Sequence, residues 1–157
     1  MLGKTYRIQV EWANHHPKLS FSKARLARFF DLIFSLHDHE PTGTLSVAFL
    51  TDETHSEIHG RFLHDFRPTD VITFPADEKE ESAGEILVSV DQAMRESSDR
   101  GLPFSEELSL YLVHGWLHLV GFDDVDEADR KIIRREEQRA MQLVRESDAW
   151  PDFLLAS

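Results

Sequence analysis

Two histidines stand four residues apart in an apolar segment of the chain. His114 and His118 lie within residues 108–119, and nearly all the remaining residues of this segment are apolar. This composition predicts a largely buried helix, and residues four apart lie one turn above each other on the same helix face. Both imidazoles would then point to one spot, the arrangement by which a helix offers two nitrogen ligands to one metal ion.

A third ligand is expected just beyond the end of that helix. Gly121 follows His118 by three residues, and Asp124 follows Gly121 by three. Because glycine adopts the positive φ that reverses a chain at a helix end, the Asp124 carboxylate can return toward the imidazoles. Three protein ligands leave the fourth position of a tetrahedral ion open to water, which is typical of catalytic zinc. The pattern therefore predicts one catalytic zinc ion held by His114, His118 and Asp124.

The histidine pair has two other interpretations. Histidines at this spacing also occur as buried core residues that hydrogen-bond to their neighbours, although the added glycine and carboxylate favour a metal. The spacing is also that of metzincin proteases, in which a glutamate beside the first histidine is the general base. That position is Gly115 in this chain, which has no side chain to act as a base, so a metzincin-like protease is the distant alternative.

Three stretches of the chain resemble one known family. Residues 114–124, HGWLHLVGFDD, resemble the HGxLHLxGYDH signature of the YbeY-type rRNA maturation endoribonucleases. Residues 68–75, PTDVITFP, are similar to the PTDVLSFP strand of that family, and residues 84–89, GEILVS, to its GDIxIS strand. The order and spacing of these stretches extend the resemblance over most of the chain.

The resemblance implies a single-strand-specific, zinc-dependent endoribonuclease of the cytoplasm, with one ion per chain. Such an enzyme matures the 3′ end of 16S ribosomal RNA in the small subunit and takes part in ribosome quality control. It cleaves RNA phosphodiesters by hydrolysis or transesterification with a water that the metal activates. The implied partners are single-stranded RNA, ribosomal RNA, the small ribosomal subunit, a small-subunit ribosomal protein and an Era-type GTPase.

The chain departs from the family pattern at two positions. Asp124 stands where the signature ends in histidine; an anionic ligand keeps the zinc but makes it a weaker Lewis acid, so lower or more alkaline activity is expected. The family arginine ahead of the PTDV stretch falls on Leu63. Arg61 and Arg67 flank that position and are the candidate phosphate contacts.

A non-enzymatic function stays open beside the nuclease. The formal net charge of −12 argues against sequence-blind binding to a polyanion, and with the two departures it gives weight to a metal-stabilised ribosome-binding module with little nuclease activity. Contacts with RNA would need local basic clusters, for which solvated helix faces are the favoured interpretation. The clusters are Lys18, Lys23, Arg25 and Arg28, and Arg130, Lys131, Arg134, Arg135 and Arg139.

The periodicity of the chain predicts an α+β fold around this site. At 157 residues, one domain spanning 1–157 is expected. Strands are predicted over 6–12, 44–50, 71–74 and 85–90, and helices over 22–36, 52–62, 91–100, 105–119 and 126–147. They would form a small four-stranded mixed sheet covered by about five helices, with the metal site on a buried helix. The absence of cysteine and of a long apolar run fits a reducing cytoplasm and excludes thiolate ligands and a membrane span.

Overall fold

The computed structural model describes residues 8–37, 42–63 and 70–157. Strands and helices alternate in the first half, and helices dominate the second, which confirms the α+β class. The elements in chain order are β1 (Ile8–Asn14), β2 (Leu19–Ser20), α1 (Lys23–Phe34), β3 (Gly43–Leu50), α2 (Asp52–Leu63), β4 (Val71–Phe74), a 3₁₀ turn (Glu78–Glu80), β5 (Ser82–Ser89), α3 (Val90–Arg100), α4 (Phe104–Val120), α5 (Glu127–Glu146) and β6 (Leu154–Leu155).

The four-stranded mixed sheet has the order β1-β3-β5-β4. β1 and β5 both run parallel to β3, whereas β4 pairs with β5 in the antiparallel sense at one edge. Parallel neighbours need a crossover connection, and α1 provides it between β1 and β3. The central strand β3 alternates between two faces: Leu45, Val47 and Phe49 are buried on the face that packs against the helices, whereas Ser46 and Ala48 on the other face are partly exposed.

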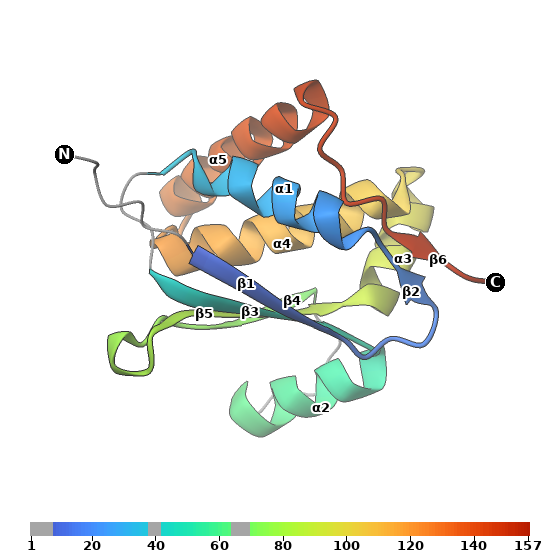
Figure 1. The fold of residues 1–157 in the computed structure, drawn as a ribbon, viewed down its shortest axis with the longest axis horizontal. Helices are drawn as coiled ribbons and strands as arrows, with labels where there is room; N and C mark the ends of the chain where they lie inside the picture. The colour runs from blue at the N-terminus through green and yellow to red at the C-terminus, as the bar shows by residue number, and fades with distance from the viewer. Residues whose placement is uncertain (1–7, 38–41, 64–69) are drawn as a thin grey trace.

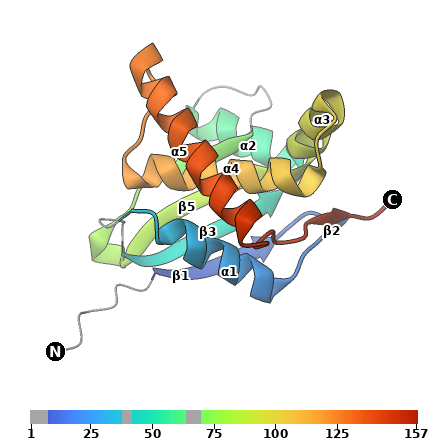
Figure 2. The ribbon, with the colours of Figure 1, turned by 90° about the horizontal axis from the view of Figure 1, so that it is seen from above.

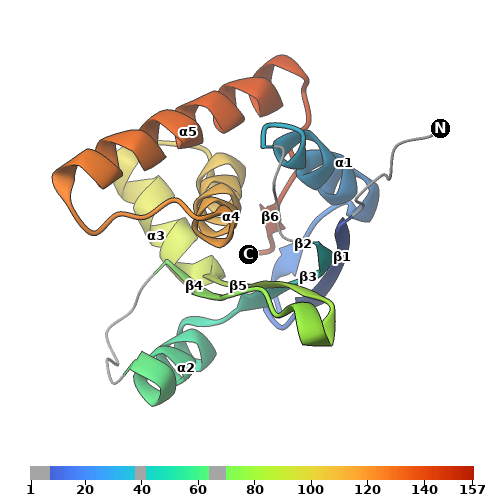
Figure 3. The same cartoon turned by 90° about the vertical axis from the view of Figure 1, so that its left-hand side faces the viewer.

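The helices are distributed unequally over the two faces of the sheet. α1 and α4 lie on one face, and α2 lies on the other (Figures 1 and 3). α5 crosses above α4 on the side away from the sheet (Figure 2), and α3 packs beside α4. α4 is therefore enclosed by protein, which explains why it is apolar almost all round. Within the described residues, no helix combines the length and the apolar composition needed to cross a membrane.

α4 approaches the sheet closely at one glycine. A Cβ atom on Gly115 would lie 2.8 Å from Cγ2 of Ile86 in β5 and 3.2 Å from Cγ2 of Val71 in β4. These separations are well below the optimum of about 3.5–4.0 Å for carbon atoms. Only glycine fits here without a shift of the helix, so Gly115 sets how closely the neighbouring His114 lies over the sheet.

The C-terminal segment, which the sequence did not place, packs against the start of the chain. β6 pairs with β2 in a two-stranded antiparallel ribbon, visible beside the C-terminus in Figure 1. Arg25 of α1 donates to the carbonyls of Trp150 and Asp148, at 2.7 Å each, and Arg28 donates to Ser147 O. Two members of the early basic cluster therefore bind backbone carbonyls beyond the end of α5, which supports a structural role for them.

Candidate metal centre

The two histidines of α4 converge as the helical spacing predicts. Nε2 of His114 lies 3.0 Å from Nε2 of His118. Two lone pairs at this separation repel unless a proton or a cation lies between them, because neutral imidazole carries one donor and one acceptor nitrogen. The side chains are 23% and 22% exposed. They are therefore recessed but reachable from solvent, unlike the buried core histidines of the alternative interpretation.

The turn after α4 brings Asp124 back to the imidazoles. Gly121 has φ +119°, and its N–H donates to the carbonyls of Leu117 and His118, while the Phe122 N–H donates to Leu117 O. A side chain at this φ would be strained, so glycine is needed for the reversal. Oδ2 of Asp124 lies 3.7 Å from Nε2 of each histidine.

The three candidate ligand atoms lie close enough together to hold one metal ion. They are the one group of three or more potential ligands found within the described ranges. The point equidistant from the three atoms, calculated from their separations, lies about 2.0 Å from each, which matches zinc bond lengths of about 2.0–2.1 Å to histidine nitrogen and carboxylate oxygen. The Asp124 side chain is 47% exposed, so the centre is open on that side. Two imidazoles and one carboxylate fit zinc chemically and geometrically.

Glu137 of α5 holds the imidazole ring of His114. Its carboxylate accepts a hydrogen bond from Nδ1 of His114, which leaves Nε2 free to bind a metal. Burial lowers the pKa of His114, but the hydrogen bond and negative charge of Glu137 outweigh burial and raise it overall. Glu137 was not predicted from the sequence, because nothing in the pattern of α5 distinguishes this glutamate from the others.

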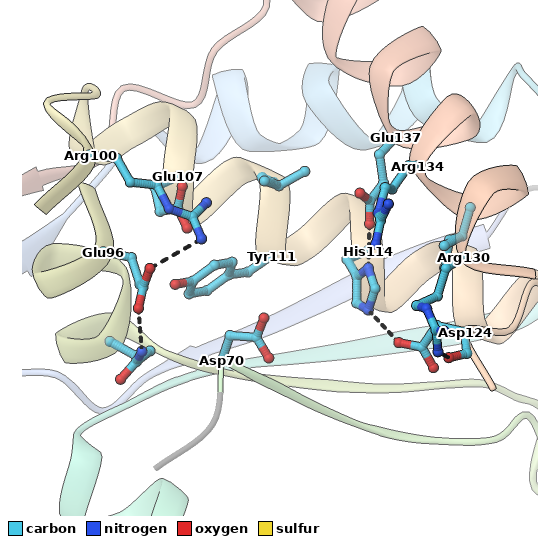
Figure 4. A pocket seen from close by; sticks show the side chains of 13 residues that line it. Asp70, Glu96, Arg100, Glu107, Tyr111, His114, Asp124, Arg130, Arg134 and Glu137 are labelled. Carbon is cyan, nitrogen blue, oxygen red and sulfur yellow. Dashed lines mark hydrogen bonds and ion pairs between the residues drawn. The ribbon is translucent and has the colours of Figure 1, made fainter. Parts of the chain in front are cut away.

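A cleft of about 450 Å³ opens beside the three candidate ligands. It lies between α3, α4 and the start of α5, with Asp70 at its floor beside β4 (Figure 4). His114, Asp124 and Glu137 line one end, together with two arginines of α5. These are Arg130 and Arg134, both members of the late basic cluster, and Nη1 of Arg130 also lies 3.3 Å from Val125 O. The favoured interpretation of that cluster as a solvated face is therefore incomplete, since two of its members line the cleft.

The structure places the predicted phosphate contacts elsewhere or does not describe them. Arg61 is exposed on α2, across the sheet from α4, and is not among the residues that line the cleft. Arg67 lies outside the described residues, as does the side chain of Leu63. The cations at the cleft come instead from Arg130, Arg134 and Arg100.

Gly115, which occupies the position of the general base in metzincin proteases, faces the sheet. Because a Cβ on Gly115 would meet Ile86 and Val71, a glutamate there would enter the packed layer between α4 and the strands instead of the ligand face. This packing supports the sequence argument against a metzincin-like protease.

Comparisons with known proteins agree with the resemblance read from the motifs. The family model for Endoribonuclease YbeY matches residues 11–145, which include all three ligands. The Endoribonuclease YbeY of Protochlamydia amoebophila is 33% identical over 138 residues, covering 85% of this chain and 91% of the relative. The Chlamydia abortus protein of the same name is 36% identical over 116 residues, covering 69% and 73%.

A solved structure has the same fold. The solution structure of TM1509 from Thermotoga maritima superposes with a TM-score of 0.60 at 21% identity, covering 91% of this chain and 95% of the other. The match to the family model spans most of the sequence, and a relative of near-equal extent is identical at a third of the 138 aligned residues. On this evidence, the chain belongs to the YbeY endoribonuclease family.

Proposed function

We propose that this protein is a zinc-dependent, single-strand-specific endoribonuclease that matures the 3′ end of 16S ribosomal RNA. The observation that carries the proposal is the convergence of His114, His118 and Asp124 on one point beside an arginine-lined cleft. Its relatives bear the name of an endoribonuclease. A structural zinc site would have a fourth protein ligand, whereas the described residues offer three.

The three ligands would hold the ion, and the neighbouring glutamate would keep the first of them in place. When bound, zinc acts as a Lewis acid on a phosphoryl oxygen and lowers the pKa of a coordinated water. Glu137 accepts a hydrogen bond from the Nδ1–H group of His114, so the ring is held in the tautomer that would present Nε2 to the ion. The negative charge of Asp124 lowers the net charge of the centre by one unit relative to three histidines.

Arg130 and Arg134 would stabilise the charge that develops on the scissile phosphate. They lie four residues apart on α5, one helical turn from each other, and both line the cleft beside His114. Cations placed where negative charge grows in the transition state lower the barrier. With a formal net charge of −12, the chain would rely on these local groups to attract the RNA backbone.

The recessed position of the three ligands supports a preference for single-stranded RNA. His114, His118 and Asp124 line an opening of about 300 Å³ together with the strand β4. A phosphodiester must enter this opening to reach the ligands, and an unpaired strand bends into a recess at a lower cost than a duplex does.

The test is cleavage of a single-stranded RNA by the purified, zinc-loaded protein. We expect His114→Ala to reduce cleavage to background and His15→Ala to leave it unchanged, since His15 is exposed at the far end of β1. Binding of the RNA without cleavage by the wild type would favour a ribosome-binding module instead. A 2′,3′-cyclic phosphate on the product would identify the RNA hydroxyl, not water, as the nucleophile.

The cellular part of the proposal follows from the family. We expect the protein to act in the cytoplasm on the small ribosomal subunit, to contribute to ribosome quality control, and to contact a small-subunit ribosomal protein and an Era-type GTPase. Depletion of the protein should cause 16S precursors with extended 3′ ends to accumulate. Elemental analysis of the purified protein should find one zinc ion per chain; another metal, or none, would contradict the cofactor assignment.

A further inference from the structure

The opening beside the three candidate ligands follows the backbone edge of a strand. Besides the ligands, it is lined by Asp70 and by three consecutive residues of β4, namely Val71, Ile72 and Thr73. Side chains of consecutive strand residues point to opposite faces of a sheet, so three in a row border one opening because it runs along their backbone. β4 is the outermost strand on this side of the described sheet, and its outer edge has no partner strand there.

The pairing of β4 with β5 determines which backbone groups point outward. The two strands are antiparallel, and the N–H of Ser89 donates to the carbonyl of Asp70 at 2.9 Å. These residues form a hydrogen-bonded pair, and bonded pairs alternate with unbonded pairs along an antiparallel ladder. The next residue of β4 that is bonded to β5 is therefore Ile72. Val71 and Thr73 direct their N–H and C=O groups away from β5, toward the free edge.

The two outward N–H groups differ in their hydrogen bonding. The N–H of Val71 donates to Oδ1 of Asp70 at 2.8 Å. The N–H of Thr73 faces away from the ladder, and no other acceptor for it occurs within the described ranges. The edge thus offers one free donor and two carbonyl acceptors. A peptide that added as a further strand would need both N–H groups, so the bond to Asp70 disfavours that occupant.

α4 places the candidate ligands beside this edge. A Cβ on Gly115 would lie 3.2 Å from Cγ2 of Val71. A Cβ on Gly84 of β5 would lie 2.8 Å from Cδ1 of Leu119 and 3.0 Å from the Phe74 carbonyl oxygen. α4 therefore runs along β4 in the same direction. The free N–H group, one residue before Phe74, and the histidine one residue before Leu119 lie at the same end of the opening.

We infer that the free edge of β4 is a ribose-phosphate subsite for single-stranded RNA; this inference rests on the proposed nuclease function. The N–H of Thr73 donates to a phosphate oxygen, and the C=O of Val71 accepts a hydrogen bond from the adjacent 2′-hydroxyl. These two backbone groups flank Ile72 and lie within about 7 Å of each other. Ribose carries its 2′-hydroxyl and 3′-phosphate on neighbouring carbons, so one nucleotide reaches both. Deoxyribose leaves the carbonyl without its donor, so the subsite distinguishes RNA from DNA.

The charge of Asp70 determines which end of the edge takes the phosphate. Its carboxylate lies at the Val71 end, where it accepts the N–H of that residue. Because like charges repel, a phosphate is disfavoured there and favoured at Thr73, beside the second histidine. The neutral 2′-hydroxyl takes the Val71 end. The subsite therefore fixes the direction of the bound strand as well as its sugar.

The first experiment changes the RNA and leaves the protein intact. Fluorescently labelled pentamers with a single 2′-deoxy or 2′-fluoro nucleotide at each position in turn are mixed with zinc-loaded protein. Fluorescence anisotropy, extrapolated to the moment of mixing, gives the affinity before any cleavage. Neither substituent can donate a hydrogen bond, so we expect both to weaken binding about 2- to 10-fold at one position. Equal affinities at every position would overturn the subsite.

Nuclear magnetic resonance locates the contact on the protein. Adding the RNA pentamer to ¹⁵N-labelled, zinc-loaded protein should shift the amide resonance of Thr73 and slow the exchange of its proton with solvent. The Ile72 amide is the internal control, because it is bonded within the sheet and should change less. A Thr73 amide that responds no more than that of Ile72 would contradict the assignment.

Two variants of one residue separate the backbone from the side chain. Thr73→Pro removes the free N–H, and proline is tolerated in an edge strand where the N–H faces outward. We expect it to weaken binding of the RNA about 10- to 100-fold, as for a hydrogen bond to a charged group. Thr73→Val keeps the N–H and should bind at least about 10-fold more tightly than Thr73→Pro. Thermal melts and zinc titrations check both folds, and equal affinities of two folded variants would overturn the donor role.

Failure of the inference differs from failure of the proposed function. Loss of affinity on removal of one 2′-hydroxyl, with a shift of the Thr73 amide, would support the subsite even if the protein cleaved no RNA. That outcome would count against the proposed nuclease alone. Cleavage of RNA with equal initial affinity for RNA and DNA would overturn the subsite and leave the nuclease in place. An extended peptide that shifts the Thr73 amide where RNA does not would also overturn it.

Discussion

Substitution of Gly115 by alanine tests how α4 is seated on the sheet. The new Cβ would lie 2.8 Å from Ile86 Cγ2 and 3.2 Å from Val71 Cγ2. Ile86 is fully buried and cannot move away, so overpacking should cost about 1–3 kcal/mol. Alanine also improves helix propensity by about 1 kcal/mol. We therefore expect Gly115→Ala to destabilise the fold by about 0–2 kcal/mol and to weaken zinc binding, because the helix must shift beside His114.

A second background separates the two opposing effects. Ile86→Ala alone should cost about 2–5 kcal/mol through the cavity that it leaves. In that background only the 3.2 Å contact with Val71 Cγ2 remains, so Gly115→Ala should become stabilising by up to about 1 kcal/mol, the propensity gain. The resulting coupling of about 1–3 kcal/mol is measured by urea denaturation of the four proteins. Equal effects of Gly115→Ala in both backgrounds, or a Gly115→Ala protein more stable than the wild type, would refute the packing argument.

Four further changes address the centre and the charges around it. Asp124→His should restore a stronger Lewis acid and shift the pH–rate profile of RNA cleavage to lower pH. Glu137→Gln should weaken zinc binding by about 10- to 100-fold in a chelator competition, because a neutral partner holds His114 less firmly. Hydrogen bonding to Arg95 holds the pKa of Asp52 below its ordinary 3.8 in the folded protein. The ionised carboxylate therefore stabilises the fold above pH 3.8, and this stabilisation is lost as the pH falls through the pKa of the folded state. Asp52→Asn should flatten the acid limb of a plot of stability against pH. Burial raises the pKa of Glu107 above 4.5, so its ionisation opposes folding at higher pH, and Glu107→Gln should stabilise the protein at pH 7 but not below pH 4.5.

Each of these four results has a clear contrary outcome. An Asp124→His profile that coincides with the wild type would show that the anionic ligand does not set the acidity of the centre. Unchanged zinc affinity in Glu137→Gln would remove the positioning role of that carboxylate, and Glu136→Gln is its neighbouring control, since Glu136 binds His37 at 2.8 Å. Parallel acid limbs for Asp52→Asn and wild type, or a Glu107→Gln effect independent of pH, would contradict the assigned pKa directions.

Local patterns allowed much of the fold and the ligand set to be predicted. Helix and strand periodicities were sufficient to locate the five helices and the four-stranded sheet of the described ranges. The positions of His114 and His118 depend on the helical repeat alone, and the return of Asp124 depends on one glycine at positive φ. These are relations between residues at most ten apart, and they follow from backbone geometry.

The residues around the ligands were decided by tertiary packing. Glu137 meets His114 because α5 crosses α4, and the same crossing brings Arg130 and Arg134 to the cleft. On the sequence these three are ordinary charged residues of an amphipathic helix. Their function depends on the angle and the offset at which two helices pack, which the side chains of both helices determine together.

The contacts of Arg25 were likewise decided by tertiary packing. Arg25 looks like a residue of a basic surface cluster in the sequence, but in the structure it binds the carbonyls of Trp150 and Asp148, more than 120 residues away. Backbone carbonyls beyond a helix end need donors wherever the chain can supply them, and the sequence does not show which donor will be near. The periodicity of the sequence therefore determined which residues of each helix and strand face inward. The packing of the elements determined which polar groups meet. Hydrogen bonds between distant segments depend on relative positions that no local pattern encodes.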